Sequence, residues 1–366
     1  MDLTGGVLGD RGLADEWDDL AARTASTPGS TPFHRHGWYA TWWASFGPAA
    51  GRLEVLTARR DGKLVGVLPV VDRHGVLTAP ANWHTFVHGP LAQDEEAARE
   101  LWARYLDRCR FTAHVAHLPA ADRAQLVAVA EDRRFTAVPD TMQRAPYIAI
   151  DGTFDGHAAT RDTRWLRQLE SRRRKLTRAG ELRLEVHDGS GDARELDRVL
   201  TELFRVEALG WKSEAGTAIV SRPDTHSFYA ALARWAASAG LLRVALMTLD
   251  GRTVAADLAL EDERSHYFLK TGFDPELRTL APGLILRRDM VARAFELGLD
   301  TYEFLGSADR YKLDWTDTVH EIDEVRLFPR TAGGLAARAA RDGARVAHRA
   351  AHEVTTRPRA AFTRRA

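Results

Sequence analysis

The residues best suited to chemistry lie between Leu241 and Trp315, where apolar segments flank a glycine-bearing turn. The segment SHYFLKTG leads into the turn FDPELRTLAPG, and the turn leads into the apolar-periodic segment LILRRDMVARAFELG. A strand that passes through such a turn into a helix leaves backbone N–H groups without partners at the helix start. The helix dipole there amounts to about half a positive charge. The stretch therefore predicts a binding site for an anion.

Two charged residues of this stretch are candidates for acid–base or binding roles. Asp257 stands in the otherwise apolar segment AADLAL, where burial would raise its pKa towards that of a usable base. The alternative is a carboxylate on a strand face that is paired with an Arg or a Lys. Lys270 precedes the turn, and we expect it either to bind a phosphate or carboxylate of a substrate or to pair with Asp257.

Two hairpins are predicted to position these residues. One covers residues 241–261 around Asp250-Gly251, and the other covers residues 53–71 around Asp61-Gly62, because Asp-Gly between apolar segments is a strong hairpin signal. Six positions of the earlier hairpin match the later one at a constant offset of 189 residues: Leu53, Val55, Asp61, Gly62, Lys63 and Val65 correspond to Leu242, Val244, Asp250, Gly251, Arg252 and Val254.

The order of predicted elements also repeats. In the first half, helices at 13–24 and 30–47 precede strands at 53–60, 63–71 and 75–82, followed by a helix at 94–109, a strand at 111–118, a helix at 120–133 and a strand near 145–151. After a strand at 181–188, the second half has helices at 193–210 and 223–240, the 241–261 hairpin, a strand at 265–272, a helix at 284–298 and a strand at 301–306. The repetition predicts two copies of one fold. The aromatic residues Trp38, Trp42 and Trp43 are expected to lie in the core.

Length and composition limit the class of protein. A chain of 366 residues exceeds what one core usually organises, so two domains are expected. A single cysteine, Cys109, excludes an internal disulfide framework and a cysteine zinc cluster, and no metal site is predicted. There is no run of about 18 apolar residues, and the acidic N-terminus lacks the apolar core of a signal peptide. We therefore expect no transmembrane segment and a cytoplasmic location.

Positive charge is concentrated in two segments. From Arg330 onward, nine arginines face only Asp342 and Glu353, a surplus of seven charges, although the whole chain is formally neutral. Residues 331–366 are expected to be a basic tail, partly helical or disordered, and a general nucleic-acid-binding surface is not indicated. Residues 156–180 are predicted to be a basic helical linker with the run Arg172, Arg173, Arg174, Lys175 and Arg178. This run is either a solvated helix face or a contact for phosphates of a tRNA or a nucleotide-linked substrate.

Several short motifs occur in a family-like order over residues 27–328. They are Thr31-Pro32-Phe33 with Trp38 and Trp42-Trp43, Arg173-Arg174-Lys175, Trp211-Lys212, Phe228-Tyr229, Tyr267-x-x-Lys270-x-x-x-Asp274, Pro282-Gly283, Gly306, and Tyr311-Lys312-x-x-Trp315. In this order the chain resembles tandem proteins of the GNAT superfamily of acyltransferases. It is most similar to those related to the Fem-type peptidoglycan aminoacyltransferases and to the acetyltransferases associated with cellulose and exopolysaccharide biosynthesis.

The resemblance implies an α/β (α+β) fold of two tandem GNAT-like domains, each a mixed, largely antiparallel sheet flanked by helices. Residues 1–155 would form a degenerate copy that helps wall the acceptor cleft, because Asp94, Glu95 and Glu96 stand where a pyrophosphate would lie. Residues 181–330 would form the copy with the acyl-donor site. The expected donor is acyl-coenzyme A, with aminoacyl-tRNA as the alternative.

The resemblance also assigns roles to individual residues. The donor turn would comprise Arg278, Leu280, Pro282, Gly283, Leu284 and Ile285; it departs from the usual Arg/Gln-x-x-Gly-x-Gly/Ala pattern because Pro282 has no N–H. Catalysis would involve Asp257, Lys270 and Tyr311, the tyrosine protonating the departing thiolate. The acceptor would contact Trp211, Lys212, Tyr229, Tyr267, Gly306, Lys312 and Trp315.

Three functions compete on this basis. The first is an N-acyltransferase that acylates an amine of a small molecule, amino sugar or peptide, including a cell-envelope precursor. The second is a Fem-like transferase that uses aminoacyl-tRNA to form a peptide bond. The third is an inactive GNAT-like binding protein.

Overall fold

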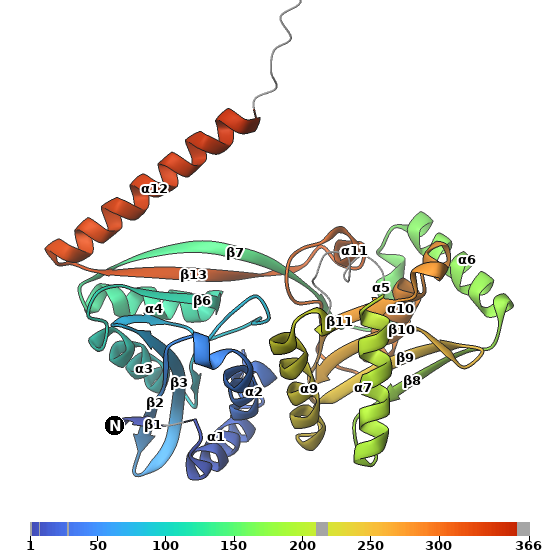
Figure 1. Ribbon diagram of the computed structural model, residues 1–366, viewed down its shortest axis with the longest axis horizontal. Helices are drawn as coiled ribbons and strands as arrows, with labels where there is room; N and C mark the ends of the chain where they lie inside the picture. Colours follow the sequence, from blue (N-terminus) through green and yellow to red (C-terminus); the bar gives the residue numbers. More distant parts are fainter. Residues whose placement is uncertain (1, 7, 28, 210–218, 357–366) are drawn as a thin grey trace, which may run out of the picture.

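The computed structural model of the protein describes residues 2–6, 8–27, 29–209 and 219–356. One mixed sheet of 13 strands runs through both halves of the chain, in the order β1-β2-β3-β4-β6-β13-β7-β12-β11-β10-β9-β8, with β5 paired beside β3 (Figure 1). Helices flank the sheet in both halves. The predicted α/β (α+β) class is confirmed.

The N-terminal half supplies the first strands of the sheet and four α-helices. Its elements are β1 (Asp2–Gly6), α1 (Arg11–Arg23), η1 (Pro32–His34), α2 (His36–Phe46), η2 (Gly47–Ala49), β2 (Arg52–Arg60), β3 (Lys63–Arg73), β4 (Val76–Thr78), β5 (Leu91–Ala92), α3 (Glu95–Asp107), β6 (Ala113–Pro119), α4 (Ala120–Asp132) and β7 (Phe135–Ala149).

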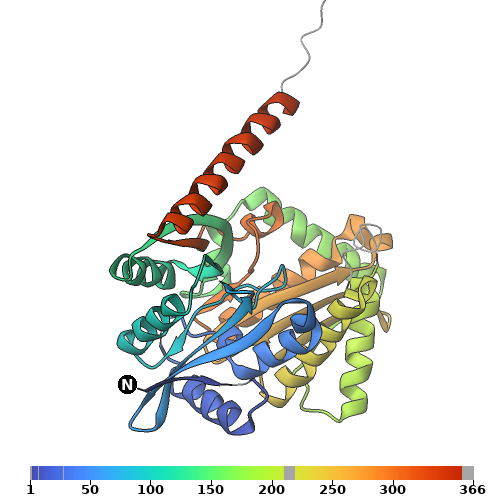
Figure 2. The same ribbon diagram turned by 60° about the vertical axis from the view of Figure 1, so that its left-hand side comes forward.

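The C-terminal half supplies the remaining strands and a long final helix. Its elements are α5 (Phe154–Ala159), α6 (Thr163–Ala179), β8 (Leu182–His187), α7 (Ala193–Glu207), η3 (Ile219–Ser221), α9 (Pro223–Ser238), β9 (Leu242–Leu249), β10 (Arg252–Glu261), β11 (Ser265–Phe273), η4 (Pro275–Leu280), α10 (Pro282–Glu296), β12 (Thr301–Glu303), α11 (Arg310–Leu313), β13 (Val319–Pro329) and α12 (Ala332–Thr356). Helix α12 projects from the body of the molecule (Figures 1 and 2).

The two hairpins repeat in backbone detail as well as in sequence. Both are present as predicted, β2–β3 and β9–β10. In the first, the register shift leaves Val65 as an extra residue; in the second, the extra residue is Val254, which lies 189 residues later. The extra residue forms a β-bulge, which increases the local strand twist. An equivalent β-bulge therefore twists the sheet in both halves.

A parallel strand pair repeats at the same offset. Leu77 of β4 pairs with Ala113 of β6, and His266 of β11 pairs with Tyr302 of β12. Each residue of the second pair stands 189 positions after its counterpart in the first. Parallel neighbours are joined through a helix in both halves, α3 in the first and α10 in the second.

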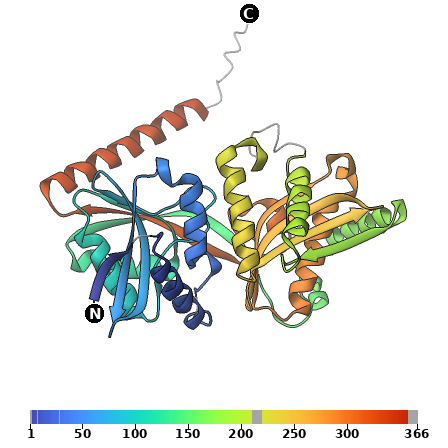
Figure 3. The ribbon, with the colours of Figure 1, turned by 60° about the horizontal axis from the view of Figure 1, so that its bottom comes forward.

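The two halves share strands and a hydrophobic core. Strand β7 pairs with β13 over most of its length and then with β12, while β13 also pairs with β6, so the last strand of the chain lies in the N-terminal part of the sheet. Helix α2 packs against α9 (Figure 3). Gly37 permits this approach, because a Cβ there would lie 1.8 Å from the Trp235 indole nitrogen. Trp38 contacts Phe228 edge to face, with ring centroids 5.5 Å apart.

Some predicted boundaries differ from the structure. The helix predicted over residues 30–47 is divided into η1 and α2, because Arg35 between them has an extended backbone. The core location expected for the tryptophans is confirmed for Trp38 and Trp42, while Trp43 is partly buried. Strand β7 is 15 residues long, about twice the predicted length. The partnership of β13 with β6 and β7 was not predicted.

The basic segments are largely helical. Within residues 156–180, α6 packs against α10 and buries Leu169 and Leu176. The domain boundaries at residues 155 and 180 stay predictions. Among the described residues, no helix combines the length and apolar character needed to cross a membrane.

Candidate functional site

The ladder between β11 and β12 is short. It joins Ser265–Tyr267 to Thr301–Glu303, whereas β11 continues to Phe273. Just beyond the last pair, Leu269 is an extra residue opposite β10, because Phe268 pairs with Ala259 and Lys270 with Leu258. On the other side, Leu305 and Gly306 turn the chain with φ of 53° and 59°. The pairing of the two strands therefore ends at Tyr267, and among the described residues no strand pairs with the β12 side of β11 beyond this point.

Helix α10 begins beside this parting without a side-chain cap. Its N-cap residue is Ala281, in the left-handed conformation with φ and ψ of 53°, and no side chain bonds to the first turn. Pro282 occupies the first helical position, where its missing N–H costs little because that group has no partner inside a helix. The exposed Arg278 adds a positive charge just before the turn. The N–H of Gly283 and the helix dipole are thus available to an anion.

The equivalent helix of the N-terminal half is already capped. The Asp94 side chain accepts a hydrogen bond from the Ala97 N–H at 2.9 Å and pairs with Arg60 at 2.8 Å. Glu95 and Glu96 follow in the first turn. A carboxylate thus occupies the start of α3, where an external anion would be repelled.

Asp257 forms a buried ion pair with a partner that the sequence analysis did not identify. Both Asp257 and Arg287 of α10 are 2% exposed, and the two carboxylate–guanidinium distances are 3.0 and 3.1 Å. Burial raises the pKa of Asp257, and the Arg287 charge lowers it. This geometry matches the alternative of a paired strand-face carboxylate. The partner is Arg287 and not Lys270, and the base role for Asp257 stays a prediction.

Arg287 links several strands beneath the parting. It donates to the Tyr302 hydroxyl of β12 at 2.6 Å, and its guanidinium carbon lies 3.2 Å from the ring centroid of Phe268 on β11. Tyr302 stacks on the buried His266, which hydrogen-bonds to Glu261 at 2.8 Å. Helix α10 is therefore tied to β10, β11 and β12 through one side chain, Arg287.

Tyr311 lies within electrostatic range of this group. Although 37% of Tyr311 is exposed, partial desolvation raises the pKa of its phenol to about 12, and the Arg287 charge acts in the opposite direction. The phenol is therefore protonated at neutral pH and can donate a proton. Its placement in α11, after the turn at Gly306, is compatible with the predicted acid role, which stays a prediction.

Two other predicted contact residues have structural partners. The Lys312 ammonium is buried and donates to the carbonyls of Leu305 at 2.8 Å and Ser307 at 2.9 Å, so it stabilises the turn that contains Gly306. Burial lowers the pKa of Lys312. Trp315 is 1% exposed and meets Trp165 edge to face at 4.8 Å. Both side chains are therefore buried and contribute to the structure around the Gly306 turn and α11.

Of the remaining candidates, Lys270 and Tyr267 lie on β11 and Tyr229 lies on α9. Lys270 places its ammonium 5.1 Å from the ring centroid of Tyr229 and 4.9 Å from that of Trp83 in the N-terminal half. Tyr267 is 5% exposed and contacts Phe33 edge to face at 5.4 Å. Trp211 and Lys212 lie outside the described residues. No group of three or more potential metal ligands occurs among residues that the structure describes.

Sequence reasoning missed Arg287 and Trp83. Arg287 had a weak signal, since it is a charge at an inward position of an apolar-periodic helix. Trp83 had none, because its contact with Lys270 joins the two halves.

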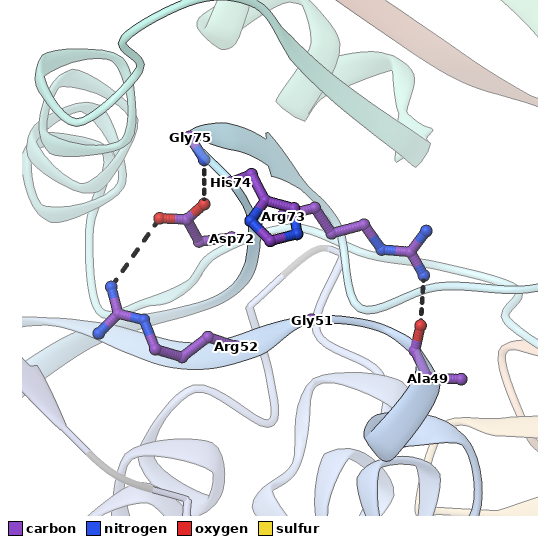
Figure 4. A pocket seen from close by; sticks show the side chains of 7 residues that line it. All are labelled: Ala49, Gly51, Arg52, Asp72, Arg73, His74 and Gly75. Carbon is purple, nitrogen blue, oxygen red and sulfur yellow. Dashed lines mark hydrogen bonds and ion pairs between the residues drawn. The ribbon is translucent and has the colours of Figure 1, made fainter.

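A separate hollow lies at the turn from β3 to β4. It is lined by Ala49, Gly51, Arg52, Asp72, Arg73, His74 and Gly75 (Figure 4). Its charges are bonded locally, since Arg73 donates to the Ala49 carbonyl at 2.9 Å and Asp72 accepts from the Gly75 N–H at 2.6 Å. It includes none of the predicted site residues, and the strand parting is the stronger candidate for chemistry.

Comparison with known proteins places the fold. Residues 162–313 match the family model described as an acetyltransferase (GNAT) domain. The structure is similar to that of FemX, with 13% identity, a TM-score of 0.56 and coverage of 89% of this chain and 97% of that one. It is also similar to the C-terminal domain (DUF2156) of a putative lysylphosphatidylglycerol synthetase from Agrobacterium fabrum, with 14% identity, a TM-score of 0.55 and coverage of 89% and 94%. A search of curated proteins gave no significant sequence match.

The matched segment contains β9 to β12, α10 and Tyr311, and so includes the strand parting and the uncapped helix start. At these identities the similar structures establish the fold alone. Residues 162–313 of the chain are a GNAT domain, and the protein is an acyltransferase of GNAT type.

Proposed function

We propose that the protein is an N-acyltransferase that moves an acyl group from acyl-coenzyme A to an amine of a small molecule, amino sugar or peptide. The observation that carries this proposal is the uncapped start of α10 beside the parting of β11 and β12. Arg278, the Gly283 N–H and the helix dipole would hold the pyrophosphate. Coenzyme A would supply the thioester that activates the acyl group.

The described residues fit this chemistry. The acceptor nitrogen forms a bond to the acyl carbon while the carbon–sulfur bond breaks, the amine loses a proton to solvent or to a base, and the thiolate takes a proton. Tyr311 is the proposed donor of that last proton, because its phenol is protonated at neutral pH. Asp257 is held by Arg287, so we assign no proton transfer to it.

Calorimetric titration with coenzyme A tests the donor site. Gly283→Glu places a carboxylate in the first turn of α10, where it suits the helix dipole but repels a diphosphate. A Cβ at Gly283 would lie 3.3 Å from Phe273, so only a small adjustment is needed. We expect coenzyme A affinity to fall at least tenfold in this variant.

The matched control is Gly333→Glu. Gly333 is likewise the second residue of a helix, α12, and a Cβ there meets no atom within 4 Å. This variant should bind coenzyme A like the wild type. Absence of binding to the wild-type protein at millimolar ligand, or an equal loss in both variants, would remove the support for this donor site.

The second candidate is an aminoacyl-tRNA-dependent transferase. Its support is the exposed cationic face of α6, with Arg174, Lys175 and Arg178, whereas Arg173 lies 3.7 Å from Asp289. Glutamine at the three exposed positions should weaken binding of charged tRNA and reduce its salt dependence, since fewer phosphate contacts release fewer counterions. Binding unchanged by the triple substitution would count against this function.

A further inference from the structure

Strand β8 ends the sheet on the C-terminal side. It is the last strand in the order and pairs with β9 along one edge, and among the residues that the structure describes no strand pairs with its other edge (Figure 1). The middle of the strand, Arg183, Leu184 and Glu185, is exposed. An exposed strand edge is a template for pairing with another chain, so β8 is a candidate interaction surface.

The direction of the backbone groups in β8 follows from its first contact with β9. The Asp250 N–H donates to the Glu181 carbonyl at 3.0 Å, just before the strand begins. The register with β9 then runs without a bulge, and alternate residues of an antiparallel strand point their N–H and C=O groups to opposite edges. Leu182, Leu184 and Val186 therefore direct these groups to the outer edge.

The side chains of β8 divide by type between its two faces. Glu181, Arg183 and Glu185 lie on one face, where they line a shared hollow beside α7. Their charges alternate in sign, and Arg183 pairs with Glu181 at 2.6 Å. On the other face, Leu182 and Val186 pack against a hydrophobic core cluster. A chain that pairs with β8 therefore meets a row of alternating charges on one face and apolar residues on the other.

We propose that β8 is a dimer interface and pairs antiparallel with β8 of a second copy of this chain, across a two-fold axis at Leu184. Such an axis places residues at equal distances from Leu184 opposite each other. Leu184 then meets Leu184 of the second copy, and Leu182 meets Val186, through the backbone groups that face outward. The pairing covers the outer edge of β8 in both copies, and the two sheets become continuous.

Charge complementarity indicates a second copy as the partner and selects the register. With Leu184 at the axis, Arg183 faces Glu185 of the second copy, and the symmetry repeats this pair. At the next charged positions outward, Glu181 faces His187. A register shifted by two residues would place Arg183 opposite Arg183 or Glu185 opposite Glu185, and like charges directly opposite each other destabilise a pair of strands. The sequence of β8 is therefore complementary to itself with Leu184 at the axis.

The proposed interface is separate from the proposed donor site. Strands β9 and β10 lie between β8 and β11, which puts β8 three strand spacings, about 14 Å, from the strand that leads to α10. The inference therefore goes beyond acyl transfer and does not depend on it. Dimer formation and coenzyme A binding are measured separately, so the failure of one proposal leaves the other standing.

Analytical ultracentrifugation of the full chain over a range of concentrations tests the interface. The wild type should show a species of twice the 40.7 kDa chain mass. Arg183→Glu and Glu185→Arg should each raise the dimer dissociation constant at least about tenfold, because each change turns two attractive pairs into two repulsive ones. An equimolar mixture of the two variants should form a heterodimer, since the facing charges are again of opposite sign. Arg198→Glu, the same charge change on α7 beside the same hollow, should leave the dimer unchanged.

A cysteine at the axis tests the register. In a Cys109→Ala background, Leu184→Cys should form an intermolecular disulfide on mild oxidation. Directly opposite residues that exchange hydrogen bonds have Cα atoms about 5.5 Å apart, which is within the range that a disulfide spans. Leu335→Cys, at an exposed position of α12, is the control and should not form this crosslink.

Four results would overturn the proposal. They are a wild type that stays monomeric at every concentration, a dimer weakened equally by Arg183→Glu and Arg198→Glu or by neither, a mixture of Arg183→Glu and Glu185→Arg that remains monomeric, and crosslinking of Leu184→Cys no stronger than that of Leu335→Cys. Thermal unfolding checks that each variant is folded. If a charge variant does not fold, the crosslink at Leu184 still decides, because it leaves both charges of the pair in place.

Discussion

The buried pair Asp257–Arg287 gives a stability prediction that also bears on catalysis. Arg287→Met removes the guanidinium and leaves Asp257 in an environment where it is 2% exposed. Removing one partner of a buried ion pair typically costs 3–5 kcal/mol. The variant also loses the bond to Tyr302 and the contact with the Phe268 ring. We expect the free energy of unfolding to fall by about 4 kcal/mol at pH 7.

The double variant Asp257→Leu/Arg287→Met is the decisive comparison. It removes both charges and keeps a similar apolar volume, so most of the loss should be recovered, to within about 1–2 kcal/mol of the wild type. Equilibrium urea unfolding of the wild type, both single variants and the double variant measures the coupling energy. The expected coupling is well above about 2 kcal/mol, because each single variant leaves one buried charge without its partner.

The pH dependence of Arg287→Met adds an internal check. Burial raises the folded-state pKa of Asp257 above its unfolded value, and loss of Arg287 removes the charge that opposes this rise. A raised carboxyl pKa means that the folded state prefers the protonated form. The cost of Arg287→Met should therefore be small near pH 4 and grow as the pH rises towards neutrality.

Two results would refute this reasoning. The first is a cost below about 1 kcal/mol for Arg287→Met at pH 7. The second is a double variant no more stable than the single one. If Asp257→Asn abolished acyl transfer while stability and coenzyme A affinity were unchanged, Asp257 would be the base and the structural assignment would be wrong.

Three further predictions follow from other parts of the molecule. Burial raises the pKa of Asp122 to about 7, so ionisation of this carboxyl lowers the stability of the folded state progressively between about pH 4 and 7. Asp122→Asn should therefore raise the free energy of unfolding by about 2–4 kcal/mol at pH 8 and by less at pH 5. The control Asp132→Asn, at an exposed position, should have little effect. Tyr311→Phe should lower kcat about 100-fold or more with coenzyme A affinity unchanged, as measured by thiol release with a saturating amine. Gly62→Ala and Gly251→Ala should each lower the free energy of unfolding, measured in urea, by about 1–2 kcal/mol, because both glycines have φ near 80° and open space at the Cβ position. A difference above about 1 kcal/mol between the two variants would mean that the two turns are not equivalent.

Elements defined by local signals were predictable from the sequence. The dipeptide Asp-Gly needs only its own backbone preference and flanking apolar residues, and both hairpins formed as predicted. Helix α3 follows from Asp94 at its N-cap and apolar residues at helical spacing. In these places residues within about twenty positions of each other determine the conformation, so a single sequence is enough to predict the secondary structure.

Features that depend on distant partners were not predictable. Strand β13 pairs with β6 and β7, which lie far before it in the sequence, and nothing in its own pattern selects that part of the sheet. An apolar run around Asp257 indicates burial but does not say which cation neutralises it. Trp83 and Lys270 come from different halves of the chain, which also meet through the His84–Tyr229 contact.

The two halves differ at the helix start on which the proposed donor site depends. Parallel pairing includes equivalent pairs, Leu77 with Ala113 and His266 with Tyr302, so the sheet geometry alone does not explain the difference. The helix that follows differs at its N-cap, which is Asp94 in α3 and Ala281 in α10. A side-chain carboxylate satisfies the first turn of α3 from within, whereas in α10 the Ala281 side chain cannot, and the Gly283 N–H is left for a ligand. The strands of both halves belong to one sheet through β7 and β13, so the difference between the two helix starts arises within a shared framework.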